Sequence, residues 1–251
     1  MKHFLFCLLF FNMFLVGSCM ADEEIDIDTL MREVEEALNG KTAQMELTMR
    51  VKTSRLERTI KMESYSVGNE KSFIKITYPR KDAGVTFLKM DKAMWQYVPR
   101  IERIIKIPAS MMLQSWMGSD FTNDDLVRES SISEDYHCKL LGEENGEYLV
   151  ELIPKEDAPV VWGRLLMRIS VEHLIPSEVR YFDELNQPVR IIHYSELQKF
   201  GEKMYPTRWV VENQTEEKKG NQTIMEITTA VFDQPVADHY FTKRALKQFS
   251  Q

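Results

Sequence analysis

Hydrophobic residues recur every three or four positions between Ile25 and Leu38, with acidic residues and an arginine between them. This spacing places the apolar side chains on one face of a helix and the charged ones on the other. Gly40 follows at the position where a glycine commonly ends a helix. The pattern therefore predicts one amphipathic helix over residues 25–38.

From Thr42 onward the hydrophobic period changes to two. Met45, Leu47, Met49 and Val51 alternate with polar residues, and the alternation continues through Met62. Such alternation is typical of strands with one buried face. Further strand-like runs follow, and Asn145-Gly146 between two of them is a strong hairpin signal. These runs are Ser72 to Tyr78, Val85 to Met90, Ala93 to Val98, Arg103 to Ile107, His137 to Leu141, Tyr148 to Ile153, Leu165 to Val171, Ser177 to Phe182, Val189 to Leu197, Thr207 to Asn213 and Thr223 to Val231.

About a dozen strands after one helix, without regular alternation of strands and helices, exclude a doubly wound α/β fold. We expect a mainly β protein with a few helices, built as a large curved antiparallel sheet or an incomplete, half-open barrel. The length of 251 residues does not require a second domain, because one β-rich domain can reach roughly 200–250 residues. Residues 21–251 are therefore interpreted as a single domain.

The segment from Pro108 to Val127 interrupts the strand pattern with methionines and aromatic residues. Thr122 and Asp125 have the spacing of a capping box, in which each side chain bonds a backbone amide of the other residue. Short helices lying over an apolar surface are the expected structure. Asp120, Asp124 and Asp125 lack the spacing of a calcium loop and are interpreted as caps and solvated charges. The polar tip over residues 215–221 is interpreted as a solvated hairpin loop.

The first twenty residues are typical of an export signal. Lys2 and His3 precede an apolar run of 13 residues from Phe4 to Val16, which is shorter than the roughly 20 residues that span a bilayer. Two cleavage sites compete. One is a lipobox that would make Cys19 the lipidated first residue, and the other is an ordinary signal-peptidase site before Asp22. Residues 1–20 are thus predicted to be removed.

Composition and charge narrow the function. The sequence is 43% hydrophobic and 28% charged, which excludes a disordered or collagen-like chain. A net charge of −7 argues against nucleic acid as a partner. Once Cys7 and Cys19 are removed or lipidated, Cys138 is the remaining thiol, so no internal disulfide can form. We interpret Cys138 as a small buried hydrophobe.

No catalytic constellation is found in the sequence: it lacks a nucleophile elbow, a zinc helix, a P-loop and a dinucleotide fingerprint. The four histidines of the mature chain are widely separated and are interpreted as structural. We therefore expect no enzyme activity, no metal and no cofactor. The chain instead contains 15 methionines. Flexible thioethers suit a surface that binds variable apolar ligands, although methionines on strands can equally fill a core.

Four segments resemble a known family. Asp91 to Pro99, with Trp95 and Tyr97, resembles the Asp-Gly-Lys-x-Leu-Trp-x-Tyr-x-Pro strand pair of the LolA-like superfamily, periplasmic carriers that sort outer-membrane lipoproteins. Residues 68–79 look like the strand pair before it, and residues 238–242 like its C-terminal stop. Gly118-Ser119-Asp120-Phe121 is similar to the signature of the branch named outer membrane lipoprotein-sorting proteins. The family glycine is missing, because Lys92 directly follows Asp91.

The resemblance implies an incomplete barrel closed by an N-terminal helix and a lid, with a cavity for acyl chains. It also implies that Lys71 takes the place of the arginine that fastens the lid in the family, although lysine lacks the planar fork of arginine. We predict that the residues contacting lipid, from the strands and the lid, are Met45, Leu47, Met49, Trp95, Tyr97, Met111, Met112, Trp116, Met117 and Phe121.

The function implied is noncatalytic binding and transport of lipid or lipoprotein acyl chains between the membranes of a bacterial envelope. A donor or export complex in the inner membrane and an acceptor in the outer membrane would be its partners. The expected location is the periplasm, with the protein either soluble or tethered through Cys19. The alternative is a lipid sensor or scaffold with the same fold.

Overall fold

The computed structural model describes residues 25–91, 93–128, 132–158 and 160–250. The predicted export signal and Cys19 lie outside the described residues. Within the described part of the chain, no helix combines the length and the apolar character needed to cross a bilayer.

The N-terminal helix forms where the hydrophobic pattern places it. Helix α1 spans Ile27–Asn39, and the side chain of Asp26 accepts a hydrogen bond from the backbone N–H of Asp28 at its start. Gly40 ends it with a φ of 63°, a left-handed conformation that glycine adopts without steric penalty. Leu30, Met31 and Val34 are buried on one face. The predicted amphipathic helix is confirmed.

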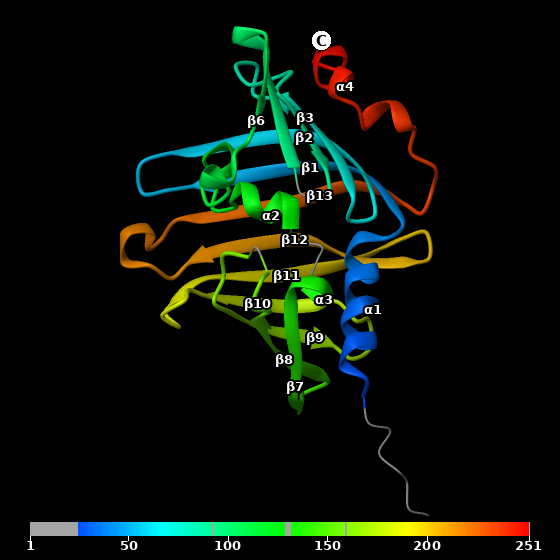
Figure 1. Cartoon of the computed structure of the whole chain (residues 1–251), viewed down its shortest axis with the longest axis vertical. Helices are drawn as coiled ribbons and strands as arrows, with labels where there is room; N and C mark the ends of the chain where they lie inside the picture. Colours follow the sequence, from blue (N-terminus) through cyan, green and yellow to red (C-terminus); the bar gives the residue numbers. More distant parts are fainter. Residues whose placement is uncertain (1–24, 92, 129–131, 159, 251) are drawn as a thin grey trace, which may run out of the picture.

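The strands form one antiparallel sheet. Thirteen strands follow the order β6-β5-β4-β3-β2-β1-β13-β12-β11-β10-β9-β8-β7, so two meandering halves join where β1 pairs with β13 (Figure 1). The sheet is open, with β6 and β7 at its two edges. The strands are β1 Thr42–Lys52, β2 Glu57–Val67, β3 Lys71–Tyr78, β4 Thr86–Met90, β5 Ala93–Val98, β6 Arg103–Lys106, β7 Tyr136–Glu144, β8 Glu147–Pro154, β9 Arg164–Ser170, β10 Pro176–Phe182, β11 Pro188–Phe200, β12 Lys203–Asn213 and β13 Gln222–Phe232.

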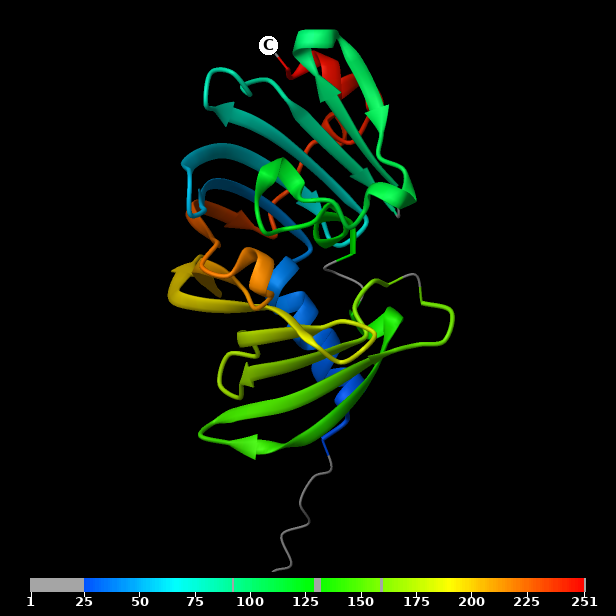
Figure 2. The same cartoon turned by 90° about the vertical axis from the view of Figure 1, so that its left-hand side faces the viewer.

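The sheet is curved, and its inner face carries the main core (Figure 2). This face is covered by α1, by α3 (Ile132–Asp135) and by residues 108–128, which we call the lid. The lid contains the 3-10 helices η2 (Ala109–Met111) and η3 (Trp116–Gly118) and the helix α2 (Asn123–Arg128). The expectation of short helices over an apolar surface is therefore confirmed.

The outer face of β3, β4 and β5 is covered separately by the C-terminal segment, which contains η5 (Asp238–Tyr240) and α4 (Lys243–Gln248). Leu246 and Ala245 of α4 are fully buried against Phe73 and Leu88 of the sheet. Two further 3-10 helices lie in turns, η1 (Pro99–Ile101) and η4 (Glu216–Lys218). Strands β2–β5 are thus enclosed between two covers, the lid inside and α4 outside.

Candidate functional site

A buried ion pair fastens the lid to the sheet. Arg190 of β11 donates through Nη1 to Asp125 Oδ2 at 2.6 Å and through Nη2 to Asp125 Oδ1 at 2.5 Å. The two side chains are 2% and 7% exposed. Asp125 also closes the capping box of α2, because it accepts from Thr122 N at 2.7 Å while Thr122 Oγ1 accepts from Asp125 N at 3.2 Å. One carboxylate therefore sets both the start of α2 and its attachment.

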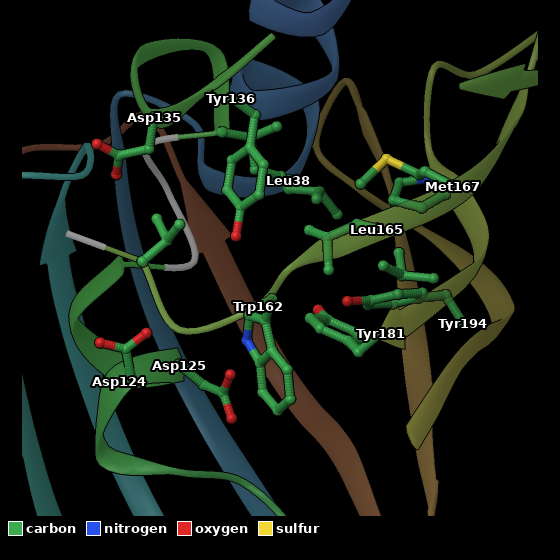
Figure 3. A pocket seen from close by; sticks show the side chains of 14 residues that line it. Leu38, Asp124, Asp125, Asp135, Tyr136, Trp162, Leu165, Met167, Tyr181 and Tyr194 are labelled. Atoms are coloured by element: carbon green, nitrogen blue, oxygen red, sulfur yellow. The ribbon is translucent and has the colours of Figure 1, made fainter. Parts of the chain in front are cut away.

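The guanidinium of Arg190 also lies against two aromatic rings. Its carbon lies 4.6 Å from the ring centroid of Trp162 and 4.1 Å from that of Tyr181, distances at which a cation is attracted to an aromatic face. These residues lie beside a pocket of about 60 Å³, which we call the aromatic pocket. Figure 3 shows Trp162 between the two carboxylates of α2, Asp124 and Asp125, and the rings of Tyr181 and Tyr194.

Further hydrogen bonds hold the lid elsewhere. Asp120 accepts hydrogen bonds from Asn213 Nδ2 of β12 at 2.5 Å and from Thr223 Oγ1 of β13 at 2.7 Å. Arg58 of β2 donates to the carbonyl oxygen of Met117 at 2.6 Å. Met117 has a φ of 50°, which lies in the left-handed region that residues other than glycine seldom adopt. The lid is thus joined to strands on both halves of the sheet by charged and polar side chains.

Beneath the lid lies a second cavity, of about 170 Å³, which we call the lid pocket. Leu38 of α1 and Asp125 of α2 line both the lid pocket and the aromatic pocket, so the two cavities are neighbours. The indole of Trp116 is 1% exposed and lies 5.4 Å from the ring of Phe87. The apolar wall of the lid pocket consists of Ala43, Met45, Leu47, Met62, Ile74, Trp116, Leu126, Tyr205, Trp209 and Met225.

One end of the lid pocket is polar. Ser66 of β2, Ser72 of β3 and Lys89 of β4 are successive partners across the strands and all line the cavity. Lys89 is only 8% exposed. The Nε1 of Trp116 is buried and has no hydrogen-bond partner within the described residues. The lid pocket therefore combines an apolar wall with a few hydrogen-bond donors, as ligand sites commonly do.

Eight of the ten residues predicted to contact lipid belong to the inner core. Met45, Leu47 and Trp116 line the lid pocket. The other five, which are buried in the same core or packed against it, are Met49, Met111, Met112, Met117 and Phe121.

Trp95 and Tyr97 do not join them, which corrects the prediction that they face the cavity. Both belong to the cluster under α4, on the outer face of the sheet. On β5 they alternate with Met94, which is buried in the inner core. Because both faces of this strand are covered, its apolar residues have no single inward parity, and the sequence pattern could not identify the inner face.

The predicted latch is also corrected. Lys71 lines the lid pocket at the start of β3, but it makes no hydrogen bond or ion pair with the lid among the residues described. Arg190 supplies the planar fork instead, from the other half of the sheet. A signal existed in the sequence, because Arg190 has the same strand parity as Ile192 and Tyr194. An arginine at such a position indicates a buried ion pair.

The two carboxylates of α2 are not solvated, in contrast to the interpretation from sequence. Asp124 is 3% and Asp125 8% exposed. Cys138 packs against the inner core, and burial raises the pKa of its thiol to about 11. The thiol is therefore protonated at neutral pH, which makes it a poor nucleophile. No cluster of three or more metal-ligating side chains occurs in the described ranges.

Comparisons with known proteins place the fold. A family model described as "uncharacterized protein" matches residues 68–248. No curated protein matches the sequence. Among solved structures, a DUF1329 family protein from Desulfovibrio piger superposes with a TM-score of 0.80 at 22% identity, over 87% of this chain and 97% of that one.

Two further structures are similar over most of their length. A putative outer membrane lipoprotein-sorting protein domain from Vibrio parahaemolyticus has a TM-score of 0.76 at 20% identity, covering 88% of this chain and 97% of its own. A LolA superfamily protein from Nitrosomonas europaea has a TM-score of 0.74 at 19% identity, covering 88% and 100%. These neighbours confirm the resemblance to the LolA-like fold as a mainly β protein with one open antiparallel sheet.

Proposed function

Because the chain belongs to the family of uncharacterized proteins whose model matches residues 68–248, and has the fold of the LolA superfamily, we propose that it is a noncatalytic carrier of acyl chains. Its cargo is a lipid or the acyl group of a lipoprotein, moved between the membranes of a bacterial envelope. Residues 21–251 act as one lipid-binding domain in this proposal.

The observation that carries the proposal is the lid pocket. Its wall is apolar and includes three methionines, Met45, Met62 and Met225, together with Trp116 and Trp209. Flexible thioethers adapt to chains of variable shape better than branched aliphatic residues do, and the indoles add large apolar surfaces. The polar end adds donors for the ester, carboxylate or phosphate that terminates an acyl chain.

We infer that the lid pocket belongs to a closed state of the carrier. An apolar cavity of about 150 Å³ holds one benzene molecule, so a pocket of about 170 Å³ admits only a short part of an acyl chain. Pockets for larger ligands typically reach roughly 300–1,000 Å³. Uptake of a long chain therefore requires the lid to move away from the sheet.

A carrier is needed because an acyl chain in water is costly. Each exposed methylene costs about 0.8 kcal/mol, so a sixteen-carbon chain costs on the order of 12 kcal/mol to expose. A curved sheet that covers the chain removes this barrier without chemistry. Binding must stay moderate, because a carrier that holds its cargo too tightly cannot deliver it.

The cellular setting is proposed on the sequence and the fold together. Residues 1–20 have the features of an export signal, and the structurally similar Vibrio protein is described as lipoprotein-sorting. We place the protein in the periplasm, either soluble or tethered through lipidated Cys19. Its partners are a donor or export complex at the inner membrane and an acceptor at the outer membrane.

The test is direct binding of an acyl chain. Delipidated protein is titrated with a fluorescent fatty acid, and we expect saturable binding that native lipid displaces. Trp116→Ala should weaken binding about tenfold, because its indole lines the lid pocket. Trp95→Ala is the matched control and should leave affinity unchanged, because Trp95 packs on the outer face.

Mass spectrometry of organic extracts from protein purified out of its native envelope should show bound acyl lipid. Absence of saturable binding by folded, delipidated protein contradicts the proposal. Equal losses in both tryptophan variants contradict the assignment of the site.

A further inference from the structure

The edge hairpin at one end of the molecule is unusually apolar for an exposed segment. All four residues of β6 are exposed, both those on one face of the strand and those on the other. Ile101 of η1 is 54% exposed, and Ile104 and Ile105 of β6 are 43% and 39% exposed. Isolated exposed aliphatic residues are common on protein surfaces, but three on one hairpin form a patch that needs an explanation.

Basic side chains surround these isoleucines. Arg100, Arg103 and Lys106 alternate with them along the hairpin, and all three are exposed. Asp82 and Glu102 are the acidic residues of the same hairpin and the neighbouring loop 79–85, which also carries exposed Arg80 and Lys81. The chain as a whole has a net charge of −7, so this region with more basic than acidic residues has the opposite sign of charge.

Helix α4 extends the basic surface. The Nζ of Lys243 lies 4.6 Å from the ring centroid of Trp95, and the Nζ of Lys106 lies 5.9 Å from the same ring. Arg244 and Lys247 of α4 are exposed as well. Both views show that the β5–β6 hairpin and α4 lie at the same end of the molecule (Figures 1 and 2). We call residues 99–106 and α4 together the basic end.

Protection of a sheet edge does not account for the basic end. Lysine and arginine on an edge strand prevent pairing with another strand. Polar residues beside them would serve that purpose, so exposed isoleucines would not be needed. Here Ile104 and Ile105 point to opposite faces of β6, so an edge-on approach presents both of them together with Arg103 and Lys106. Aliphatic side chains surrounded by cations match the boundary of an anionic bilayer, where apolar groups enter and cations meet phosphates.

We propose that the basic end is a docking surface for the anionic face of a lipid bilayer. The isoleucines enter the headgroup region, and the basic side chains of β6 and α4 bind lipid phosphates. The proposal does not depend on cargo binding, because the basic end is separate from the residues that line the lid pocket.

The experiment is flotation of the full-length chain with vesicles, using a Cys19→Ser background so that no lipid anchor contributes. Vesicles of phosphatidylcholine with phosphatidylglycerol should bind the protein, and vesicles of phosphatidylcholine alone should bind it at least tenfold more weakly. Added salt should weaken the binding. Each basic residue near an anionic surface contributes about 1 kcal/mol, or about fivefold in affinity.

Two matched pairs of variants locate the surface. Arg100→Gln with Arg103→Gln should weaken binding about 25-fold, whereas Lys218→Gln with Lys219→Gln, at the exposed tip after β12, should have no effect. Ile104→Ser with Ile105→Ser should weaken binding at least tenfold. Leu185→Ser removes an aliphatic side chain that is 79% exposed on the β10–β11 turn and should have no effect.

Unchanged unfolding midpoints will show that the variants are folded. The proposal is overturned if neutral and anionic vesicles bind equally, if the tip variants reduce binding as much as the hairpin variants, or if no vesicle binds. Trp116→Ala separates this proposal from the carrier function, because it should weaken fatty-acid binding about tenfold and leave vesicle binding unchanged.

Discussion

Strands β2–β5 are covered on both faces, and the two covers are attached by different chemistry. Outside, α4 is held mainly by apolar packing, with Leu246 and Ala245 fully buried and one hydrogen bond from Thr86 Oγ1 to the Leu246 carbonyl oxygen at 2.7 Å. Inside, the lid packs Trp116 and Phe121 into the core and is also held by polar contacts of Arg58 and Arg190 beside a cavity. In the proposed carrier, these directional bonds are the part of the attachment that contacts with cargo can replace.

The largest effect is expected at the ion pair of the lid. Arg190→Met leaves the carboxylate of Asp125 buried without its cation, and breaking such a pair typically costs about 3–5 kcal/mol. We expect a loss of this size in the free energy of unfolding, measured by urea denaturation. Arg190→Met combined with Asp125→Leu should recover part of it, because the charge of Asp125 is removed together with its partner, whereas the bond that Asp125 accepts from Thr122 N is lost.

Arg180→Met is the control, since Arg180 is 49% exposed in its pair with Glu178. Exposed pairs contribute roughly 0–1 kcal/mol. Equal losses at Arg180 and Arg190 would show that the lid is not held by the buried pair.

The next effect concerns the outer cover. Leu246→Ala removes a fully buried side chain from beneath α4, and such truncations cost about 2–5 kcal/mol. Because the two covers are separate, we expect Leu246→Ala to lower the free energy of unfolding by this amount and to keep its affinity for a fluorescent fatty acid unchanged. A clear loss of affinity in the folded variant would mean that the two covers are coupled through the strands between them.

A smaller effect is expected in the lid pocket. Met45 is half-buried and lines the cavity. Met45→Ala should reduce fatty-acid affinity about tenfold, or about 1.4 kcal/mol, because it removes apolar contact with the chain. Met90→Ala is the matched control, since Met90 packs against the outer cluster. If both variants bind with unchanged affinity, the lid pocket is not where the chain lies.

The sequence predicted most of the fold, because alternation along each strand is a local signal. The run from Ser72 to Tyr78, for example, became β3 with one added residue, and the Asn145-Gly146 turn joins β7 and β8. The alternation pattern could not show which face of a strand points inward where both faces are apolar. Trp95 on β5 is the example, because the outer cover comes from α4, far along the chain.

The site was predictable in its apolar part and less so in its polar contacts. Met111, Met112, Trp116 and Met117 are clustered in one segment of the sequence, which predicted short helices over an apolar surface. The partner of Asp125 is 65 residues away on β11, and the pairing depends on how the two halves of the sheet curve toward each other. The parity of Arg190 on its strand indicates an inward side chain but does not identify its partner, and the family resemblance implied Lys71 as the latch instead.

The two covers should also differ slightly in how their contribution to stability depends on pH. In the described part of the chain the buried carboxylates, Glu35, Asp124, Asp125 and Asp135, all lie on the inner side, so the α4 cover has none. Glu35 of α1 accepts hydrogen bonds from the backbone N–H and the hydroxyl of Ser133, both at 2.9 Å, at the start of α3. Burial raises the pKa of its carboxyl, and the bonds from Ser133 only partly offset this.

A carboxyl whose pKa is higher in the folded than in the unfolded chain favours folding when it is protonated. Its contribution to the free energy of unfolding is therefore greatest below the unfolded pKa, near 4.5, and falls as the pH rises through the raised folded pKa. Glu35→Gln should remove this fall, so that its stability curve is flatter than the wild-type curve just above pH 4.5. Glu33→Gln, on the exposed face of the same helix, should leave the curve unchanged. Urea denaturation across this pH range measures the difference, and coincident profiles for wild type and Glu35→Gln would show that the contact between α1 and α3 does not titrate with folding.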